Sequence, residues 1–549
     1  MADTLQQLLR TRTGDTTPAV KYGDRVWSWR EHLADASATA AALIGIADPK
    51  RPLHVGALLG NTPDMLTAMA AAALGGYVLC GINDTRRGAA LAKDILRADC
   101  QILLTDPAHR PLLDGLDLPG VRVLDTPPQA GGAPTAGEWC GLLATAGPLV
   151  PHREVVPTDT FMMIFTSGTS GEPKAVRVTH LTVIFAGASL IERFEVDPSG
   201  VCYLSMPLFH SNALLAGWSV AVGSGAAMVP ATFSASGLLS DLRRYGVTYL
   251  NYVGKPLAYV LATPERPDDA DNPLRVAFGN EASDRDIAEF SRRFDCTVWD
   301  GFGSTEGAII ITREDGCPPG SLGQGFPGVS VYNPDTLAEC PVARFDNDGA
   351  LINADEAIGE LVNTSGAGLF AGYYNDQEAT DARLRHGMFW SGDLAYRDAD
   401  GWIYFAGRSG DWLRVDGENM TTAPIERILQ RLPAVSQVAV YAVPDEQVGD
   451  QVMAALVLVD DAELTSGEFG EFLAGQPDLS PKAWPRHVWI TDGLPSTATN
   501  KILKRELSSR GSTPEGGLLW TRIGRDNTYV VVDRAATPRP RSTGRAAPV

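Results

Sequence analysis

Along roughly the first 150 residues, segments with a pattern typical of helices alternate with segments typical of strands. Residues 34–46 are rich in alanine and predict a helix, whereas the continuous apolar run at residues 54–59 predicts a buried strand. A second alanine-rich helix is predicted to begin at residues 61–64, and residues 77–80 predict the next strand. Strands and helices in this order favour a mainly parallel sheet with helices packed against it.

The same alternation returns after a break. Residues 126–152 are rich in proline, glycine and alanine, which predicts a loop. Beyond this break the pattern predicts four strands, at residues 201–206, 226–230, 247–253 and 274–278. From residue 320 to residue 405 the pattern changes to short strands and turns, and Asp400-Gly401 between two apolar runs predicts a β-hairpin.

The chain after Arg408 has a pattern of its own. Thr422 can cap a helix in which apolar residues recur at helical spacing, and strands follow at residues 437–443 and 451–459. We therefore predict a large domain at residues 1–408, a small α+β domain at 409–511 and a C-terminal extension at 512–549. The last 15 or so residues contain arginine and proline but no acid, and they are expected to be disordered.

One polar loop between two apolar strands carries the clearest chemical signal. Residues 161–180 read FMMIFTSGTSGEPKAVRVTH, which predicts a strand, a glycine- and hydroxyl-rich loop and a second strand. Glycine allows backbone N–H groups to approach an anion, hydroxyl groups can donate to phosphate oxygens, and Lys174 adds a positive charge. The spacing differs from a Walker A loop, because the lysine does not open a helix. A flexible surface linker is the alternative, but the flanking apolar strands disfavour it.

Composition restricts the class of protein. The chain has 549 residues, of which 44% are hydrophobic and 20% charged, and its formal net charge is −20. That charge repels nucleic acid and anionic membranes, and it also repels ATP, so a nucleotide site needs local cations. Seven scattered cysteines without a C-x-x-C motif and an N-terminus without an apolar core indicate a reducing cytoplasm.

Three further motifs have both a functional and a plain structural interpretation. In WDGFGSTEG (299–307), Phe302 can cover a purine and Glu306 can help hold Mg²⁺, although such a turn is common. In FWSGD (389–393), Asp393 can accept hydrogen bonds from a ribose diol, supported by Arg408, or can simply end a turn. In TNKILKREL, the residues alone favour a solvated Lys501.

Taken in order, these motifs resemble the ANL superfamily of adenylate-forming enzymes, which includes acyl-CoA synthetases, adenylation domains and luciferases. The resemblance covers about residues 20–510 and is greatest to fatty-acid–CoA ligases of actinobacteria and to the fatty-acid transport protein branch. It implies an α/β fold with a large N-terminal lobe of mixed and parallel sheets, a distorted barrel and a small mobile α+β C-terminal domain. It also implies that a hydrophobic carboxylic acid, a fatty acid or a steroid side-chain acid, is activated with Mg·ATP and transferred to coenzyme A.

The resemblance assigns roles to individual residues. The phosphate loop is implied to hold ATP through Thr166, Ser167, Gly168, Thr169, Ser170, Gly171 and Lys174. The adenine is implied to lie among Asn280, Glu281, Ala282 and Phe302, with Gly303 and Ser304 in the same nucleotide-binding motif. The ribose is implied to lie at Asp393 and Arg408, and CoA at Arg414 and Gly417. The implied catalytic residues are Lys501, Thr305, His210 and Glu306, the last also as metal ligand.

Several details depart from the superfamily or remain open. Gly410 occupies the expected hinge position, where many relatives have a polar residue, and Asn500 replaces the usual glycine before the lysine. His210 among apolar residues is more typical of a packing or gate residue than of a base. The acyl pocket is expected near His210, Asn212, Trp218, Tyr252 and Gly254, with Gly217 and Gly254 leaving room for a bulky chain.

Two other functions stay possible at this stage. An acyl-AMP ligase would pass its product to a carrier protein instead of CoA. A lipid-binding or uptake protein would not catalyse at all, but it has no need for the combination of Lys174, Glu306, Asp393, Arg408 and Lys501. Neither peripheral contact with a membrane nor assembly into a homodimer is decided by the sequence.

Overall fold

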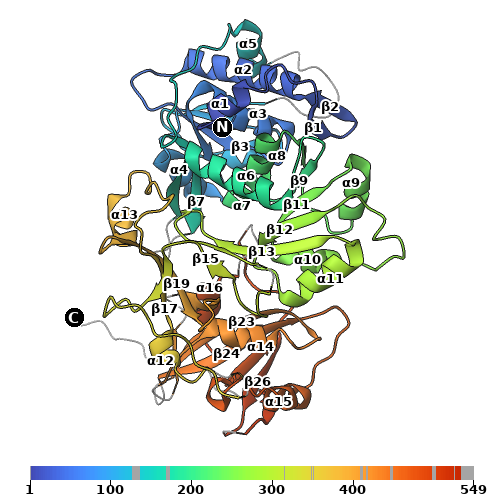
Figure 1. The fold of residues 1–549 in the computed structure, drawn as a ribbon, viewed down its shortest axis with the longest axis vertical. Helices are drawn as coiled ribbons and strands as arrows, with labels where there is room; N and C mark the ends of the chain where they lie inside the picture. Colours follow the sequence, from blue (N-terminus) through green and yellow to red (C-terminus); the bar gives the residue numbers. More distant parts are fainter. Residues whose placement is uncertain are drawn as a thin grey trace, which may run out of the picture.

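A computed structural model gives the fold. It describes residues 2–126, 137–167, 173–314, 316–347, 349, 351–408, 412–415, 418–445, 449–497, 502–512, 514–524 and 526–532. The described chain forms four sheets with helices packed against them, which confirms the predicted α/β class. The N-terminal elements lie at the upper end in Figure 1 and the C-terminal sheet at the lower end.

The six-stranded sheet has the order β6-β5-β3-β4-β7-β8. All neighbours in it are parallel except β7 and β8, which form an antiparallel pair. Its strands are β3 (His54–Leu58), β4 (Val78–Gly81), β5 (Ile102–Thr105), β6 (Arg122–Asp125), β7 (Thr160–Ser167) and β8 (Pro173–Thr179). The accompanying helices are α1 (Leu5–Arg10), α2 (Trp29–Ile46), α3 (Pro63–Gly75), α4 (Gly88–Arg97), η1 (Arg110–Leu113) and α5 (Glu138–Thr145).

The nine-stranded sheet has the order β15-β14-β13-β12-β11-β9-β10-β1-β2. Its strands are β1 (Pro18–Tyr22), β2 (Arg25–Ser28), β9 (Val201–Leu204), β10 (Ala227–Pro230), β11 (Tyr249–Val253), β12 (Val276–Asn280), β13 (Thr297–Gly303), β14 (Ile310–Thr312) and β15 (Gln324–Gly325). Its helices are α6 (His180–Phe194), α7 (Ser211–Ala213), the π-helical turn η2 (Leu214–Trp218), α8 (Ser219–Ser224), α9 (Leu238–Tyr245), α10 (Lys255–Leu261) and α11 (Asp284–Phe294). The carboxyl ends of β11, β12 and β13, which are parallel, meet at one edge.

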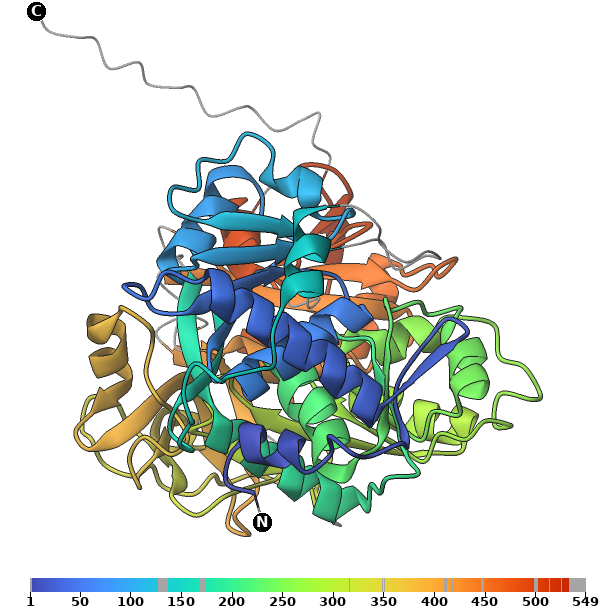
Figure 2. The same ribbon diagram turned by 90° about the horizontal axis from the view of Figure 1, so that it is seen from above.

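A five-stranded sheet completes the large part of the chain. It has the order β16-β17-β19-β18, and β20 pairs with β19. Its elements are β16 (Val329–Tyr332), α12 (Ala354–Ala357), β17 (Gly359–Asn363), α13 (Gln377–Arg383), β18 (Leu384–Arg385), β19 (Met388–Arg397) and β20 (Ile403–Arg408). The β19–β20 pair is the predicted hairpin at Asp400-Gly401. In both ribbon views α13 lies on the opposite side of the molecule from α9, α10 and α11 (Figures 1 and 2).

The C-terminal sheet has the order β22-β21-β24-β25-β26-β27, with β23 beside β24. Its strands are β21 (Trp412–Val415), β22 (Glu418–Thr421), β23 (Val435–Asp445), β24 (Gly449–Leu458), β25 (His487–Ile490), β26 (Leu518–Arg522) and β27 (Tyr529–Val531). Its helices are α14 (Thr422–Leu429), α15 (Ser466–Ala474), η3 (Pro481–Ala483) and α16 (Lys504–Ser509). The last two strands come from the extension, and Trp520 and Tyr529 are buried in the same core as Leu413 and Leu429.

Two elements differ from the sequence-based predictions. The segment predicted as a loop at residues 126–152 contains α5, whose Trp139 is 5% exposed and packs in the main core. Burial of this one large side chain outweighs the helix-breaking composition around it. The helix predicted to be capped by Thr422 begins at Thr422, and its N-cap is Thr421, whose side chain makes no capping hydrogen bond.

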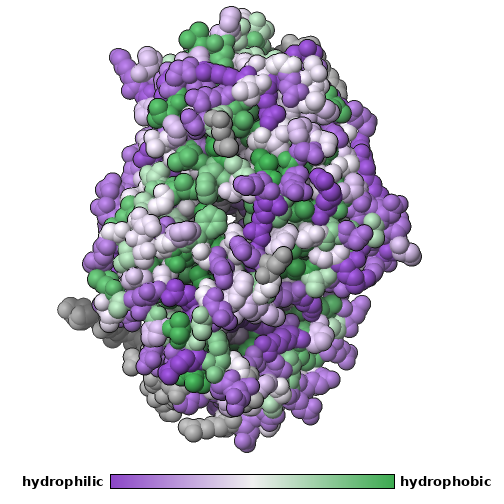
Figure 3. Space-filling model, in the orientation of Figure 1, coloured by the Kyte–Doolittle hydropathy of each residue, from purple (hydrophilic) through white to green (hydrophobic). Residues whose placement is uncertain are grey.

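The C-terminal part contacts the rest through polar side chains. Arg427 donates to the carbonyl oxygen of Gly320 (2.9 Å) and to the hydroxyl of Tyr396 (3.2 Å). Lys255 Nζ donates to Gln437 Oε1 at 2.7 Å. On the face seen in Figure 3, hydrophobic residues are interspersed among hydrophilic ones. Among the described residues no helix has both the length and the apolar character that crossing a membrane requires.

Candidate functional site

The hairpin β7–β8 carries the predicted phosphate loop at its tip. The register pairs Phe165 with Ala175 and Thr166 with Lys174, so the apolar strands end where the polar loop begins. Lys174 Nζ lies 5.1 Å from the centre of the Tyr373 ring, a cation–π contact that fixes the position of the charge. The two predicted strands on either side of the loop are therefore confirmed. Gly168, Thr169, Ser170 and Gly171 lie outside the described residues, and so does the side chain of Ser167.

The turn after β13 carries the predicted adenine and metal residues. Phe302 lies in β13, 6.0 Å from the ring of Phe405, and is only partly buried. The hydroxyls of Thr305 and Ser211 lie 2.9 Å apart, and Glu306 Oε1 accepts a hydrogen bond from the Tyr373 hydroxyl at 2.8 Å. Ser304 Oγ is buried and has no hydrogen-bond partner in the part of the chain that the structure describes. An unpaired buried donor at this turn fits a phosphate oxygen.

The segment predicted to flank the adenine follows β12 and is held from two sides. Asn280 accepts a backbone hydrogen bond from Gly254 at 2.6 Å, and Glu281 has the left-handed backbone angle φ +66°. The N–H of Ala282 donates to Asp300 Oδ2 at 2.8 Å, and the Tyr252 hydroxyl lies 3.4 Å from the same oxygen. Asp300 therefore ties this segment to β13. Its role could not be predicted from the sequence, because a single acid between Trp299 and Gly301 has no spacing that distinguishes it from other acids.

Asp300 makes stability depend on pH. Burial raises the pKa of Asp300 to about 7, although the hydrogen bond from Ala282 and the charge of Arg313 act in the opposite direction. A carboxyl with a raised pKa binds its proton more tightly in the folded chain than in the unfolded one. Its contribution to stability is thus present below its unfolded pKa and is lost as the pH rises through the folded value.

We expect Asp300→Asn to remove this pH dependence. Between pH 5 and pH 8, the free energy of unfolding of the wild type should fall by roughly 2–3 kcal/mol relative to the variant. Urea denaturation of both proteins at several pH values measures the difference. Two parallel stability profiles across this range would show that Asp300 keeps an ordinary pKa.

A chain of three amides joins the acyl side of the site to the adenine side. Asn251 Nδ2 donates to Asn212 Oδ1 at 2.7 Å, and Asn212 Nδ2 donates to Asn280 Oδ1 at 3.0 Å. Asn280 Nδ2 then donates to the carbonyl oxygen of Gly301 at 2.7 Å. The network links the start of α7 to β11, β12 and β13, so it holds the strand ends in register around the site.

The predicted ribose pair forms directly across the β19–β20 hairpin. Asp393 and Arg408 are cross-strand partners, and Arg408 Nε lies 3.4 Å from Asp393 Oδ1. Asp393 is 8% exposed, and the side chain of Arg408 is 40% exposed, so the carboxylate is fixed while the guanidinium stays accessible. The pair can present two carboxylate oxygens to a diol.

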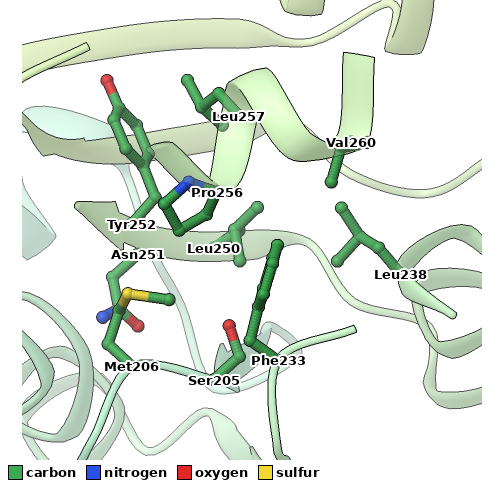
Figure 4. A pocket seen from close by; sticks show the side chains of 10 residues that line it. All are labelled: Ser205, Met206, Phe233, Leu238, Leu250, Asn251, Tyr252, Pro256, Leu257 and Val260. Atoms are coloured by element: carbon green, nitrogen blue, oxygen red, sulfur yellow. The ribbon is translucent and has the colours of Figure 1, made fainter. Parts of the chain in front are cut away.

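A small apolar cavity lies beside β11, and only part of the predicted acyl pocket lines it. Side chains from α9, β11 and α10 line a cavity of only about 10 Å³, room for roughly one water molecule, among them Leu238, Leu250, Tyr252, Leu257 and Val260 (Figure 4). Tyr252 is the one predicted pocket residue in this wall. Trp218 instead stacks on Phe161, with ring centres 5.5 Å apart, and is fully buried in the core.

The two glycines predicted to leave room for the acyl chain serve close packing instead. A Cβ on Gly217 would lie 2.7 Å from Leu204 Cδ2 and 2.8 Å from Asn251 Oδ1. Gly254 has φ +44°, and its Cβ would lie 2.9 Å from the carbonyl oxygen of Glu281. Neither position therefore opens space.

His210 packs on Phe209 with ring centres 4.5 Å apart, and burial lowers its pKa to about 4, which keeps the ring neutral.

Several predicted residues fall outside what the structure describes. Lys501, the hinge position Gly410, Gly417 and Asn500 are in this group, as is the side chain of Arg414. The strands that flank the lysine segment are described: β25 precedes it, and β26 pairs with β25 after it. The roles assigned to the undescribed residues remain predictions.

Comparison with known proteins agrees with this arrangement. The AMP-binding enzyme family matches residues 10–374, and the AMP-binding enzyme C-terminal domain matches residues 424–501. The medium/long-chain-fatty-acid–CoA ligase FadD17 of Mycobacterium marinum is 50% identical over 510 residues, which is 92% of this chain and 96% of that protein. The steroid-22-oyl-CoA synthetase of Rhodococcus jostii is 42% identical over 516 residues, 92% of this chain and 91% of that protein.

Solved structures share the fold. The crystal structure of ATP-bound MatB from Rhodopseudomonas palustris superposes with a TM-score of 0.80 at 22% identity, covering 93% of this chain and 99% of that one. The anthranilate CoA ligase AuaEII in complex with anthranoyl-AMP also has a TM-score of 0.80, at 20% identity, covering 92% of this chain and 96% of that one.

Proposed function

This chain belongs to the AMP-binding enzyme family, and we propose that it is an ATP-dependent acyl-CoA ligase for a hydrophobic carboxylic acid. The observation that carries the proposal is that three of the motifs, the phosphate hairpin, the turn after β13 and the Asp393–Arg408 pair, lie close together. Lys174 contacts Tyr373, Tyr373 contacts Glu306, and Thr305 contacts Ser211 at the start of α7. Asp393 and Arg408 face each other at the neighbouring hairpin.

The reaction proceeds in two steps. A carboxylate oxygen of the acid attacks the α-phosphorus of ATP, the bond from that phosphorus to the bridging oxygen breaks, and pyrophosphate leaves. The sulfur of CoA then attacks the acyl carbon of the acyl-AMP, the thiol proton is released, and AMP leaves. Because the first step brings a carboxylate to a polyphosphate, positioning and fixed positive charge must supply most of the catalysis.

Different residues of the site would bind different parts of the substrates. Lys174 and the loop before it would hold the outer phosphates, Thr305 and Ser304 the α-phosphate, and Asp393 with Arg408 the ribose. Lys501 would bond the acyl carboxylate and an oxygen of the nucleotide during the first step. Rotation about Gly410 would then bring Arg414 and Gly417 to the CoA side for the second step.

The donor set around Glu306 fits Mg²⁺ bound through the nucleotide. Among the described residues no three or more His, Cys, Asp and Glu side chains form a metal cluster. Mg²⁺ commonly uses one or two carboxylates together with substrate phosphates, and Glu306 supplies one carboxylate beside the phosphate hairpin. When bound there, the ion would neutralise phosphate charge, and Glu306 would help to hold it.

The substrate is proposed to be a medium- or long-chain fatty acid or a steroid side-chain acid. Two similar proteins bear these activities in their names. The cavity beside β11 is lined mainly by aliphatic and aromatic side chains, which favours an apolar chain over a charged acid. The cavity is small, so a long chain would require the side chains of α9 and α10 to move apart.

A substrate screen tests this proposal. Acids from acetate through long-chain fatty acids to steroid carboxylates are incubated with ATP and MgCl₂, with and without CoA, and AMP formation is measured. We expect the highest rate with a long-chain or steroid acid and sustained AMP release only with CoA. A preference for acetate would contradict the substrate class. Turnover with an acyl carrier protein but not with CoA would instead identify an acyl-AMP ligase, and no AMP with any acid would identify a binding protein.

A further inference from the structure

Tyr373 lies at the centre of the nucleotide site without a role in the scheme above. It follows Gly372 in a segment that pairs with the edge of β8: the N–H of Arg177 donates to the Gly372 carbonyl oxygen at 3.1 Å, and Val176 and Tyr373 form a β-bridge. The N–H of Tyr373 donates to Thr380 Oγ1 on α13 at 3.0 Å. Tyr373 is 6% exposed, so its ring and hydroxyl are held between the phosphate hairpin and α13.

The hydrogen bonds through the Tyr373 hydroxyl have a fixed direction. Arg383 Nε, at the end of α13, lies 3.4 Å from the hydroxyl oxygen, and that hydroxyl lies 2.8 Å from Glu306 Oε1. A guanidinium can only donate and a carboxylate can only accept, so the hydroxyl accepts from Arg383 and donates to Glu306. Burial first, and the nearby charge of Glu306 second, raise the pKa of Tyr373, which keeps the proton that this donation requires.

Arg383 brings positive charge to two carboxylates of the site. Its Nη1 donates to the Trp390 carbonyl oxygen at 3.2 Å, just before Asp393. Burial lowers the pKa of Arg383, but the bond to Tyr373 and the charges of Glu306 and Asp393 outweigh burial and raise it. Gly392 makes room for the guanidinium, because a Cβ at this position would lie 2.7 Å from Arg383 Nη1. Together with the backbone angle φ +77° of Gly392, this close approach favours glycine at this position of the SGD motif.

We propose that Tyr373 and Arg383 are positioning residues that hold the Glu306 carboxylate in the orientation in which it meets the metal-bound polyphosphate. This inference rests on the proposed function, in which Glu306 is the protein's ligand to Mg²⁺. The Tyr373 hydroxyl donates to Glu306 Oε1. In the proposed arrangement, this bond leaves the other carboxylate oxygen available on the side of the phosphate hairpin. Neither residue touches the reacting atoms, so their effect passes through Glu306.

Removal of the Tyr373 hydroxyl tests the inference without use of the full reaction. ATP is titrated by calorimetry into the wild type and Tyr373→Phe, without acid or CoA, once with MgCl₂ and once with EDTA. We expect the variant to bind ATP about 10-fold more weakly than the wild type in MgCl₂, the size of effect typical of a residue that orients a metal ligand. In EDTA the two proteins should bind ATP within a factor of two of each other.

The chain offers matched controls. Tyr374 is the next residue, and its hydroxyl donates to Asp99 Oδ2 at 2.7 Å, so Tyr374→Phe removes a hydrogen bond of similar length away from Glu306. Arg385 lies two residues after Arg383 and donates to Glu360 Oε2 at 3.2 Å. We expect Arg383→Lys to weaken Mg-dependent ATP binding about as much as Tyr373→Phe does. Tyr374→Phe and Arg385→Lys should change it less than twofold.

The outcomes separate the inference from the function on which it rests. Equal ATP binding by wild type and Tyr373→Phe in MgCl₂ would overturn the inference. An equal loss of ATP affinity in MgCl₂ and in EDTA would also overturn it, because the hydroxyl would then act without the metal. A Mg-dependent loss in Tyr373→Phe would support it even if no acid gave AMP in the substrate screen, a result that would reject only the ligase function.

Discussion

Replacement of Lys501 by alanine should slow formation of the acyl-adenylate by roughly 10²–10³, the usual effect of removing one preorganised donor from a site where negative charge gathers. The physical reason lies in the charge balance of the first step. A carboxylate must approach a polyphosphate on a chain of net charge −20, so each local cation lowers the barrier. Lys174 and Arg408 are the cations proposed for the phosphates and the ribose, and Lys501 is the cation proposed for the acyl carboxylate.

The measurement is pyrophosphate release in a single turnover with ATP and the preferred acid, before CoA is added. Lys482 provides a control, because it is an exposed lysine on η3 in the same part of the chain. Lys482→Ala should release pyrophosphate at the wild-type rate. An unchanged rate for Lys501→Ala would remove Lys501 from the first step, and equal losses in the two variants would point to a general effect of charge.

Arg293→Ala should lower the free energy of unfolding by about 3–5 kcal/mol, because it leaves a buried carboxylate without its partner. Arg293 Nε donates to Asp269 Oδ2 at 2.6 Å, and the two side chains are 5% and 2% exposed. The same guanidinium also donates to the carbonyl oxygens of Val260, Thr263 and Pro264, at 3.2, 2.8 and 3.0 Å. It therefore fixes the end of α10, whose Val260 lines the cavity beside β11.

The adjacent residue is a matched control for this prediction. Arg292 forms ion pairs with Glu265 and Glu289, but its side chain is 54% exposed. Solvent screens such pairs, so Arg292→Ala should change stability far less than Arg293→Ala does. Urea denaturation of both variants measures the contrast. Similar small losses for the two would mean that the Arg293–Asp269 pair is not desolvated in solution.

Local sequence patterns were sufficient to predict those parts of the site that are built from residues close together along the chain. The phosphate hairpin was predictable, because two apolar strands enclose a polar loop and the β7–β8 register follows from that pattern. The hairpin at Asp400-Gly401 was predictable in the same way, but its turn alone would place Asp393 opposite Gly407. A one-residue register shift between Leu394 and Ala395 brings Arg408 opposite Asp393. The superfamily resemblance drawn from these motifs is confirmed by the family matches.

Contacts made between distant segments were not predictable. Tyr373 reaches Glu306 because residues 372–374 pair with the edge of β8, and nothing in the sequence near Tyr373 indicates that pairing. Arg383 on a polar helix resembles any surface arginine until Gly392 is seen to make room for it. Gly217 and Gly254 were predicted to widen a pocket, but a missing Cβ can equally allow close packing, and only the neighbouring atoms decide which applies.

The most direct test of the ligase function is the product balance of one reaction. The protein is incubated with ATP, MgCl₂, CoA and the acid that gives the highest rate in the substrate screen, and AMP, ADP, pyrophosphate and acyl-CoA are quantified together. If the protein is an acyl-CoA ligase, each turnover gives one AMP, one pyrophosphate and one acyl-CoA, and no ADP forms. When ATP is omitted, no acyl-CoA forms. Formation of ADP, or AMP without acyl-CoA, would contradict the account.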